Sequence, residues 1–447
     1  MAHPSWFTSG QPHVWLPYTQ MKTASAALPL VGAKGARLML ADGRELVDGT
    51  ASWWCAAHGY QHPHIVDAVT RQAATLSHVM LGGLAHEQPY RLAARLAEQL
   101  PGDLNHVFFS ESGSVSVEIA MKMAVQFHLN RGGGGRYQPG LSRATDGAER
   151  TRFLSFTGGY HGDTFATMSV CDPEEGMHTM FGGVVPEQIV VPLPQTTDTQ
   201  AAFCQTLDEH GDTIAAVIVE PMVQGAGGML FHDADVLRVL RHETERRGIL
   251  LIFDEIFVGF GRLGHSMFAC EAAGVVPDII TVSKALSGGT LPLAATVARD
   301  HVFEAFLDDD PEKALMHGPT YMGNALACAA ANASLDLFET EPRLVQCQGI
   351  ERMLSERLAS LANLPGVLDV RCRGGIGVVQ LASDVPMAGL GSAFVDAGVF
   401  IRPFRDVVYV TPPLNIPDDD LDILATALTT VLPAWLERHV KLNRALA

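Results

Sequence analysis

The chain has 447 residues, enough for two or three domains, and 47% of them are hydrophobic, which is ample for a sizeable core. Its formal net charge of −18 disfavours nucleic acid or an anionic membrane surface as the main partner, although a phosphate-bearing small molecule needs only local donors. The seven cysteines include no Cys-x-x-Cys pair, which disfavours a disulfide framework and favours reduced thiols in the cytoplasm. We find no signal-peptide pattern and no apolar run of about 18 residues that would predict a membrane-spanning helix.

Three segments follow one another along the chain. Residues 1–60 are irregular with short strands and are expected to pack with the small domain, residues 61–335 alternate strand-like and helix-like patterns, and residues 336–447 form a smaller α+β domain. Continuous apolar runs separated by helical patterns predict an α/β fold whose mostly parallel sheet is covered by helices on both faces. The expected strands of the large domain are 106–109, 152–156, 215–219, 249–253, 279–282 and 293–297.

Two adjacent tryptophans, Trp53 and Trp54, stand out in the first segment. Neighbours in a strand point to opposite sides, so we expect one tryptophan in the core and the other at a cavity; packing of both in the core is equally open. His58, His62 and His64 lie close together, but no carboxylate or cysteine stands at a helpful spacing. No metal site is therefore predicted.

The stretch 110–116, Ser-Glu-Ser-Gly-Ser-Val-Ser, follows a strand and opens a helix. Val115, Ile119, Met123 and Phe127 recur every four residues and predict the buried face of that helix. Glycine lets the backbone come close to a ligand, and a helix start offers free N–H groups, so the stretch can cradle a phosphate. Ordinary helix capping by serine is an equally good interpretation.

Another glycine-rich stretch, Gly158-Gly-Tyr-His-Gly-Asp163, follows the strand at 152–156. Tyr160 can lie on the face of a planar cofactor, and Asp163 adds a negative charge suited to an amine-bearing substrate. A simple turn is the alternative.

An acid and a lysine close two of the predicted strands. Asp254 and Glu255 end one apolar run, and Lys284 follows the next run, Asp278–Val282, before a glycine-rich turn. Because ligands of open α/β sheets gather at the carboxyl ends of the strands, Asp254 and Lys284 are expected across one crevice. A desolvated lysine loses its proton and can form a Schiff base, while a carboxylate can keep a pyridine nitrogen protonated. This combination suits pyridoxal phosphate; a surface lysine and a buried structural ion pair are the alternatives.

The stretch Gly259-Phe-Gly-Arg-Leu-Gly264 matches the glycine pattern of dinucleotide-binding oxidoreductases. That pattern needs a helix directly after a strand and a second acidic strand end about 20 residues later, and neither is predicted here. We instead interpret Arg262 as a candidate ligand for a substrate carboxylate.

Together these residues resemble the class III aminotransferases, which depend on pyridoxal phosphate and have fold type I. The resemblance covers nearly the whole chain and is carried, in order, by Gly-Ser at 113–114, Gly-Tyr-His-Gly within 158–162, Asp-Glu-Ile at 254–256, Gly-Phe-Gly-Arg at 259–262, Ser-Lys at 283–284 and His-Gly-Pro-Thr at 317–320. Further pieces are similar to the biotin-synthesis branch: 14–19, 53–55, 160–164, 316–324 and 400–404.

The resemblance implies a role for each matching residue. Lys284 would be the Schiff-base lysine and proton shuttle, Asp254 would pair with the ring nitrogen, and Tyr18 would join them as a catalytic residue. Cofactor contacts would come from Gly113, Ser114 and Tyr160, with Pro319 and Thr320 supplied by the partner subunit of a homodimer. Substrate contacts would come from Arg402, which holds the carboxylate, supported by Tyr18, Trp53, Trp54, Tyr160, Asp163, Arg262, Lys284 and Gly318.

The implied reaction moves the amino group of S-adenosylmethionine to 8-amino-7-oxononanoate in two half-reactions. Aromatic walls suit two unlike substrates, because they line an aliphatic chain or face a sulfonium cation. The chain departs from the branch at Leu16, Phe257, Val258 and Leu263, which lie beside the chemistry. The alternative is another class III aminotransferase, using an ω-amino acid or lysine as the donor.

Overall fold

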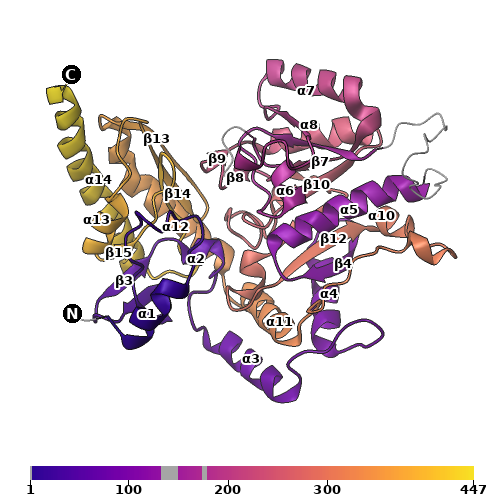
Figure 1. Ribbon diagram of the computed structural model, residues 1–447, viewed down its shortest axis with the longest axis horizontal. Helices are drawn as coiled ribbons and strands as arrows, with labels where there is room; N and C mark the ends of the chain where they lie inside the picture. Colours follow the sequence, from indigo (N-terminus) through magenta and orange to yellow (C-terminus); the bar gives the residue numbers. More distant parts are fainter. Residues whose placement is uncertain (1–2, 132–149, 174–178, 447) are drawn as a thin grey trace. The chain divides into compact units, whose positions relative to one another are not determined.

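The computed structural model describes residues 3–131, 150–173 and 179–446 (Figure 1), with side chains up to residue 439. The chain divides into two compact units, a larger one of His64–Gln348 and a smaller one of Met1–Pro63 with Gly349–Ala447. The sequence ended the large domain at residue 335, whereas the contacts extend it to Gln348. Helix α11 (Ala325–Thr340) packs against α4 (Glu87–Gln99), which keeps it within the larger unit.

A seven-stranded sheet forms the centre of the larger unit, in the order β4-β12-β11-β10-β7-β5-β6. Strand β12 runs antiparallel to both of its neighbours, whereas β11, β10, β7, β5 and β6 pair in parallel, so the expected mostly parallel sheet is confirmed. The short β6 had no counterpart in the predicted strands, since three residues give no usable pattern. The strands are β4 (Leu104–Ser110), β5 (Arg152–Phe156), β6 (Ile189–Val191), β7 (Ile214–Val219), β10 (Leu250–Asp254), β11 (Ile279–Val282) and β12 (Ala294–Arg299).

Helix α5 (Gly113–Arg131) runs along this sheet and contacts β4, β7, β10, β11 and β12. Its predicted apolar face is confirmed, since Ile119, Met123 and Phe127 are buried and Val115 packs against the same core. The other helices of the larger unit are α3 (Pro63–Thr75), α6 (Phe165–Ser169), α7 (Thr197–His210), α8 (Ala234–Glu245), α9 (Ala269–Ala273) and α10 (Asp300–Glu304).

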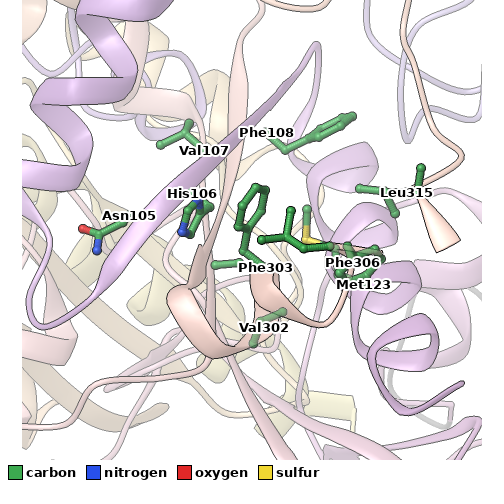
Figure 2. Close-up of a pocket in the computed structure, with 12 residues that line it drawn as sticks. Asn105, His106, Val107, Phe108, Met123, Val302, Phe303, Phe306 and Leu315 are labelled. Atoms are coloured by element: carbon green, nitrogen blue, oxygen red, sulfur yellow. The ribbon is translucent and has the colours of Figure 1, made fainter. Parts of the chain in front are cut away.

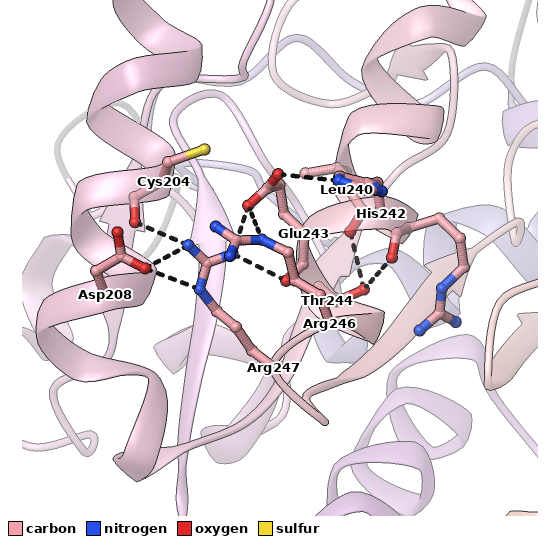
Figure 3. A network of polar contacts seen from close by, with 9 residues as sticks. Cys204, Asp208, Leu240, His242, Glu243, Thr244, Arg246 and Arg247 are labelled. Carbon is pink, nitrogen blue, oxygen red and sulfur yellow. Dashed lines mark hydrogen bonds and ion pairs between the residues drawn. The ribbon is translucent and has the colours of Figure 1, made fainter.

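Charged residues tie two of these helices together. Figure 3 shows Arg247 between Asp208 of α7 and Glu243 of α8, and Arg247 also donates to the backbone carbonyl of Glu243 at 3.1 Å. Arg246 adds a 2.8 Å hydrogen bond to the Glu243 carboxylate. These contacts fasten α7 to α8.

The amino end of the central strands carries a buried carboxylate, Asp278, directly before β11. It accepts hydrogen bonds from the backbone N–H of Leu251 at 2.7 Å and from Arg241 at 2.9 Å, and His301 lies 3.3 Å away. Burial alone would raise the pKa of Asp278, but His301 and Arg241 outweigh it and lower that pKa. The charge is thus compensated from several sides.

The smaller unit contains two sheets, one of β1-β2-β3-β15 and one of β13-β14-β16. Strand β15 pairs in parallel with β3, so residues from both ends of the sequence share one sheet and one core, in which Val47 packs with Ile401 and Leu424. The elements are α1 (Ser5–Gly10), β1 (Leu30–Lys34), β2 (Arg37–Leu40), β3 (Glu45–Asp48), α2 (Ala51–Trp54), β13 (Val367–Arg373), β14 (Ile376–Leu381), α13 (Leu390–Asp396), β15 (Val399–Phe400), β16 (Val407–Val410) and α14 (Asp418–Leu446). The division between the units falls inside α12 (Arg343–Leu358).

Within the described part of the chain, no helix combines the length and apolar character needed to cross a membrane.

Candidate functional site

The acid and the lysine singled out in the sequence close two neighbouring strands. Strands β10 and β11 are parallel, with Asp254 opposite Thr281, and the Thr281 hydroxyl donates to Asp254 Oδ1 at 3.3 Å. Lys284 begins the 3-10 turn Lys284–Ser287 beyond β11, with a φ of +41°, and the hydroxyl of Ser283 before it donates to the Leu293 carbonyl at 2.8 Å. The expectation that the two strands are neighbours is confirmed.

Asp254 shares its buried surroundings with two residues that the sequence left without a role. His161 Nδ1 and Asp254 Oδ2 are hydrogen bonded at 2.8 Å, and both side chains are buried. Glu220 follows β7 in register beside Asp254, because Val219 pairs with Phe253. Its carboxylate accepts from the backbone N–H groups of Tyr160 and Gly225, each at 2.9 Å.

Burial raises the pKa of Glu220 to about 7, and Asp254 adds to the rise, while His161 opposes it. The sequence could have indicated Glu220 by the same pattern that indicated Asp254, because both acids directly follow an apolar run. Two carboxylates and an imidazole therefore meet at the carboxyl ends of β7 and β10.

The second acid of the Asp254-Glu255 pair has a structural task. Glu255 is buried and accepts hydrogen bonds from the backbone N–H groups of Ala269 at 2.7 Å and Cys270 at 2.8 Å, at the start of α9. Burial raises its pKa to about 7. Its oxygens thus satisfy two N–H groups that a helix start leaves without partners.

The start of α5 combines a closely packed glycine with backbone N–H donors. An added Cβ at Gly113 would lie 2.9 Å from the Ile256 side chain, so a larger residue there would require that side chain to shift. Among the described residues, the N–H groups of Gly113 and Ser114 have no acceptor, and the buried hydroxyl of Ser110 has no hydrogen-bond partner. The Ser114 hydroxyl accepts from the backbone N–H of Asp163 at 3.1 Å. Donors at a positive helix end can hold an anion such as phosphate.

Tyr160 belongs to the same neighbourhood, because Asp163 links it to the cradle. Its hydroxyl donates to Asp163 Oδ1 at 2.9 Å, and its backbone N–H is held by Glu220. Asp163 is exposed. Hydrogen bonds thus connect Tyr160, Asp163 and Ser114.

The glycine pattern at 259–264 does not open a helix; the next helix, α9, begins only at Ala269. The structural context of a dinucleotide-binding loop is therefore missing. Arg262 within it is almost fully buried, and its backbone carbonyl accepts from the Cys347 thiol at 3.4 Å.

Two side chains of the larger unit contact the backbone in and just before the stretch Gly318–Thr320. Lys122 of α5 donates to the Met316 carbonyl at 2.8 Å, and His78 Nε2 lies 2.8 Å from the Thr320 carbonyl. Gly318 and Thr320 are exposed, and Pro319 is half-buried.

The smaller unit carries the remaining predicted residues. Trp53 is 39% exposed, with the Arg402 guanidinium 5.1 Å from its ring centre and Tyr18 edge-on to it at 6.4 Å. Trp54 is only 9% exposed and packs against Tyr409. Of the two tryptophans, Trp53 therefore joins the cluster with Tyr18 and Arg402, and Trp54 belongs to the core.

The backbone that separates the two tryptophans is a left-handed turn, α2, and not a strand. Ala51, Ser52, Trp53 and Trp54 have φ values of +45°, +49°, +55° and +73°. Such a conformation costs roughly 1–2 kcal/mol for each residue with a Cβ. It persists only where the surroundings fix it, and such strain gathers at functional sites.

A separate apolar pocket of about 400 Å³ lies in the larger unit beside β4, β12 and α10. Figure 2 shows His106, Phe108, Phe303 and Phe306 among the side chains that line it, and the rings of His106 and Phe303 stack at 3.8 Å. No residue that the sequence assigned to cofactor or substrate lines this pocket.

Comparison with known proteins gives these features a family context. The model of the family described as Aminotransferase class-III matches residues 18–432. The chain is 40% identical to the adenosylmethionine-8-amino-7-oxononanoate aminotransferase of Corynebacterium glutamicum over 436 residues, which cover 96% of this chain and 98% of that protein.

Two solved structures show the same fold. That of the enzyme with the same name from Methanocaldococcus jannaschii has a TM-score of 0.87 at 31% identity, over 95% of this chain and 97% of that one. A PLP-bound amine transaminase from an uncultivated Pseudomonas species has a TM-score of 0.81 at 30% identity, over 94% and 98% of the two chains.

Proposed function

The chain belongs to the class III aminotransferase family, and we propose that it transfers the amino group of S-adenosylmethionine to 8-amino-7-oxononanoate, a step of biotin synthesis. The observation that carries the proposal is the near-complete match to relatives of that name, the first of which is 40% identical over 96% of this chain. The parallel placement of Asp254 and the strand before Lys284 agrees with it.

Pyridoxal phosphate fits the residues present. The N–H groups of Gly113 and Ser114 and the partnerless hydroxyl of Ser110 are suited to its phosphate, and Asp254 is suited to its ring nitrogen. When bound, the cofactor supplies an electron-withdrawing ring that carries the amino group from one substrate to the next.

The larger unit supplies the acid–base chemistry in this proposal. With the cofactor bound, the Lys284 amine would be the base that removes a proton from the carbon on the donor side of the amino nitrogen and the acid that delivers it to the cofactor carbon on the other side of that nitrogen. Asp254, fixed by His161 and Thr281, holds the proton of the ring nitrogen. Tyr160 would hold the cofactor ring by aromatic contact, and Asp163 would attract the substrate amine.

The substrates need an apolar wall and a carboxylate ligand. On the smaller unit, Trp53 and Tyr18 suit the aliphatic chain of the acceptor or the sulfonium of the donor, and Arg402 suits the carboxylate of either. On the larger unit, Arg262 is assigned a supporting role, and Gly318 leaves room for the substrate.

We further propose a homodimer in which Pro319 and Thr320 serve the cofactor phosphate of the other subunit. Exposed apolar side chains on the larger unit support a protein contact there: Met80, Leu84, Met316 and Tyr321. Light scattering on the purified protein should give twice the mass of 48.0 kDa, and a monomer would contradict this part of the proposal.

The donor half-reaction tests the function. Holoenzyme mixed with S-adenosylmethionine and no acceptor should lose the visible absorbance of the aldehyde cofactor, and 8-amino-7-oxononanoate should restore it. Lysine and an ω-amino acid are the matched alternative donors. If one of these bleaches the cofactor and S-adenosylmethionine does not, the chain is another class III aminotransferase.

A further inference from the structure

The left-handed turn Ala51–Trp54 is held by one buried carboxylate, Asp48, at the end of β3. Asp48 Oδ1 accepts from the N–H of Thr50 at 2.7 Å and from its hydroxyl at 2.8 Å. Asp48 Oδ2 accepts from the N–H of Ser52 at 3.3 Å, inside the turn. The two carboxylate oxygens of Asp48 therefore accept hydrogen bonds from backbone N–H groups directly before and within the turn.

Tyr60 completes the arrangement from beyond the turn. Its hydroxyl donates to Asp48 Oδ2 at 2.5 Å and lies 2.6 Å from Ser52 Oγ. Its backbone is fixed by two hydrogen bonds with Gly35, at 2.8 and 3.0 Å. Burial and the charge of Asp48 raise the pKa of Tyr60, so the hydroxyl keeps the proton that it donates.

The turn decides which side chain faces outward. With this backbone Trp54 packs on Tyr409 in the core, and Trp53 contacts Tyr18 and Arg402. A relaxed backbone would move Trp53 away from Arg402, because the left-handed conformation is disfavoured for residues with a Cβ. The hydrogen bonds of Asp48 and Tyr60 thus control the pairing of Trp53 with Arg402.

We infer that Asp48 and Tyr60 are positioning residues for the acceptor substrate: they maintain the left-handed turn that keeps Trp53 beside Arg402. The ring and the guanidinium then present one surface to a molecule with a long aliphatic chain and a terminal carboxylate. The inference rests on the proposed function for the identity of that molecule, and on the hydrogen bonds of the turn for everything else.

Tyr60→Phe tests the inference, because it keeps the buried ring and removes only the hydroxyl that bonds Asp48 and Ser52. In holoenzyme, the KM for 8-amino-7-oxononanoate should rise roughly tenfold, the size expected for one lost hydrogen bond to a charged group, while kcat changes less than about threefold. The near-ultraviolet circular dichroism of the tryptophans should change in the direction seen for Trp53→Phe. Tyr90→Phe, which removes an exposed hydroxyl of the larger unit, is the matched control and should leave both readouts unchanged.

Ser52→Ala is the milder variant should Tyr60→Phe fold poorly, since it removes a single hydrogen bond of the same hydroxyl. It should raise the KM two- to threefold, about a third to a half of a tenfold effect on the free-energy scale. An unchanged KM together with an unchanged tryptophan spectrum in either folded variant overturns the inference. The spectrum is recorded without substrate, so it separates this result from a failure of the wild-type enzyme to use the proposed acceptor.

Discussion

The two ends of the central strands treat buried carboxylates in opposite ways. At the amino end, Asp278 is contacted by Arg241 and His301, with Arg299 at 3.8 Å, and its pKa is lowered. At the carboxyl end, Glu220 sits beside Asp254 with a pKa raised to about 7. The carboxylate at the amino end is compensated by cations, whereas burial beside a second carboxylate raises the pKa of Glu220 at the carboxyl end.

The largest expected effect is on catalytic rate and concerns the Lys284 amine, beyond the carboxyl end of strand β11. Lys284→Ala should lower kcat by at least about 10⁴-fold, because it removes the group proposed to move the proton. The unfolding midpoint of the apoprotein should stay within a few degrees of wild type, as measured by circular dichroism. Undiminished transamination in this variant would reject the role of Lys284.

At the amino end of the central strands, removing the buried carboxylate should lower the stability of the fold. Asp278→Ala should lower the free energy of unfolding by about 3–5 kcal/mol, since it leaves Arg241 and His301 without their buried counter-charge. Urea unfolding followed by fluorescence measures it. Asp235→Ala is the matched control, because Asp235 is an exposed partner of Arg238 and should contribute less than about 0.5 kcal/mol.

The contributions of Glu220 and Asp278 to the free energy of unfolding should depend on pH in opposite directions. The pKa of Glu220 rises from 4.5 to about 7 on folding, so between these values the folded chain binds more protons than the unfolded chain. Its contribution to stability should therefore fall as the pH rises through that window, by about 3 kcal/mol at most. The contribution of Asp278 is present above its unfolded pKa of 3.8 and is lost as the pH falls through the lowered folded value.

Glu220→Gln isolates the first of these effects. Urea unfolding of the apoprotein between pH 5 and 8 should show a flatter pH profile for the variant, with the amide retaining an acceptor for one of the two backbone N–H groups. A variant profile that follows the wild type would show that Glu220 does not titrate in this window.

The smallest effect is expected at the phosphate cradle before and at the start of α5, where one hydroxyl is removed. Ser110→Ala removes a buried hydroxyl without a hydrogen-bond partner, so the unfolding free energy of the apoprotein should change by less than about 0.5 kcal/mol. The Kd for pyridoxal phosphate, measured by fluorescence titration, should rise several-fold, because the hydroxyl is proposed to meet the phosphate. Unchanged affinity would remove Ser110 from the cradle.

Much of the larger unit was determined by local pattern. Continuous apolar runs predicted its main strands, and an acid and a lysine at the ends of two of them predicted a pair of neighbouring strands, which β10 and β11 are. The glycine and serines at the start of α5 predicted a cradle, and Gly113 packs closely against the Ile256 side chain. These features follow from sequence because each depends on residues adjacent in the chain and on the general rules of parallel sheets.

Tertiary structure alone decided how distant residues meet. Glu255 follows Asp254 directly in the chain but binds the start of α9, and His161 contacts Asp254 across 93 residues. The tryptophan pair was expected to divide as in a strand, yet the division arises from a left-handed turn. That turn is unfavourable by itself and makes hydrogen bonds to Asp48 and Tyr60, which lie outside it, so the residues Ala51–Trp54 alone could not have indicated it.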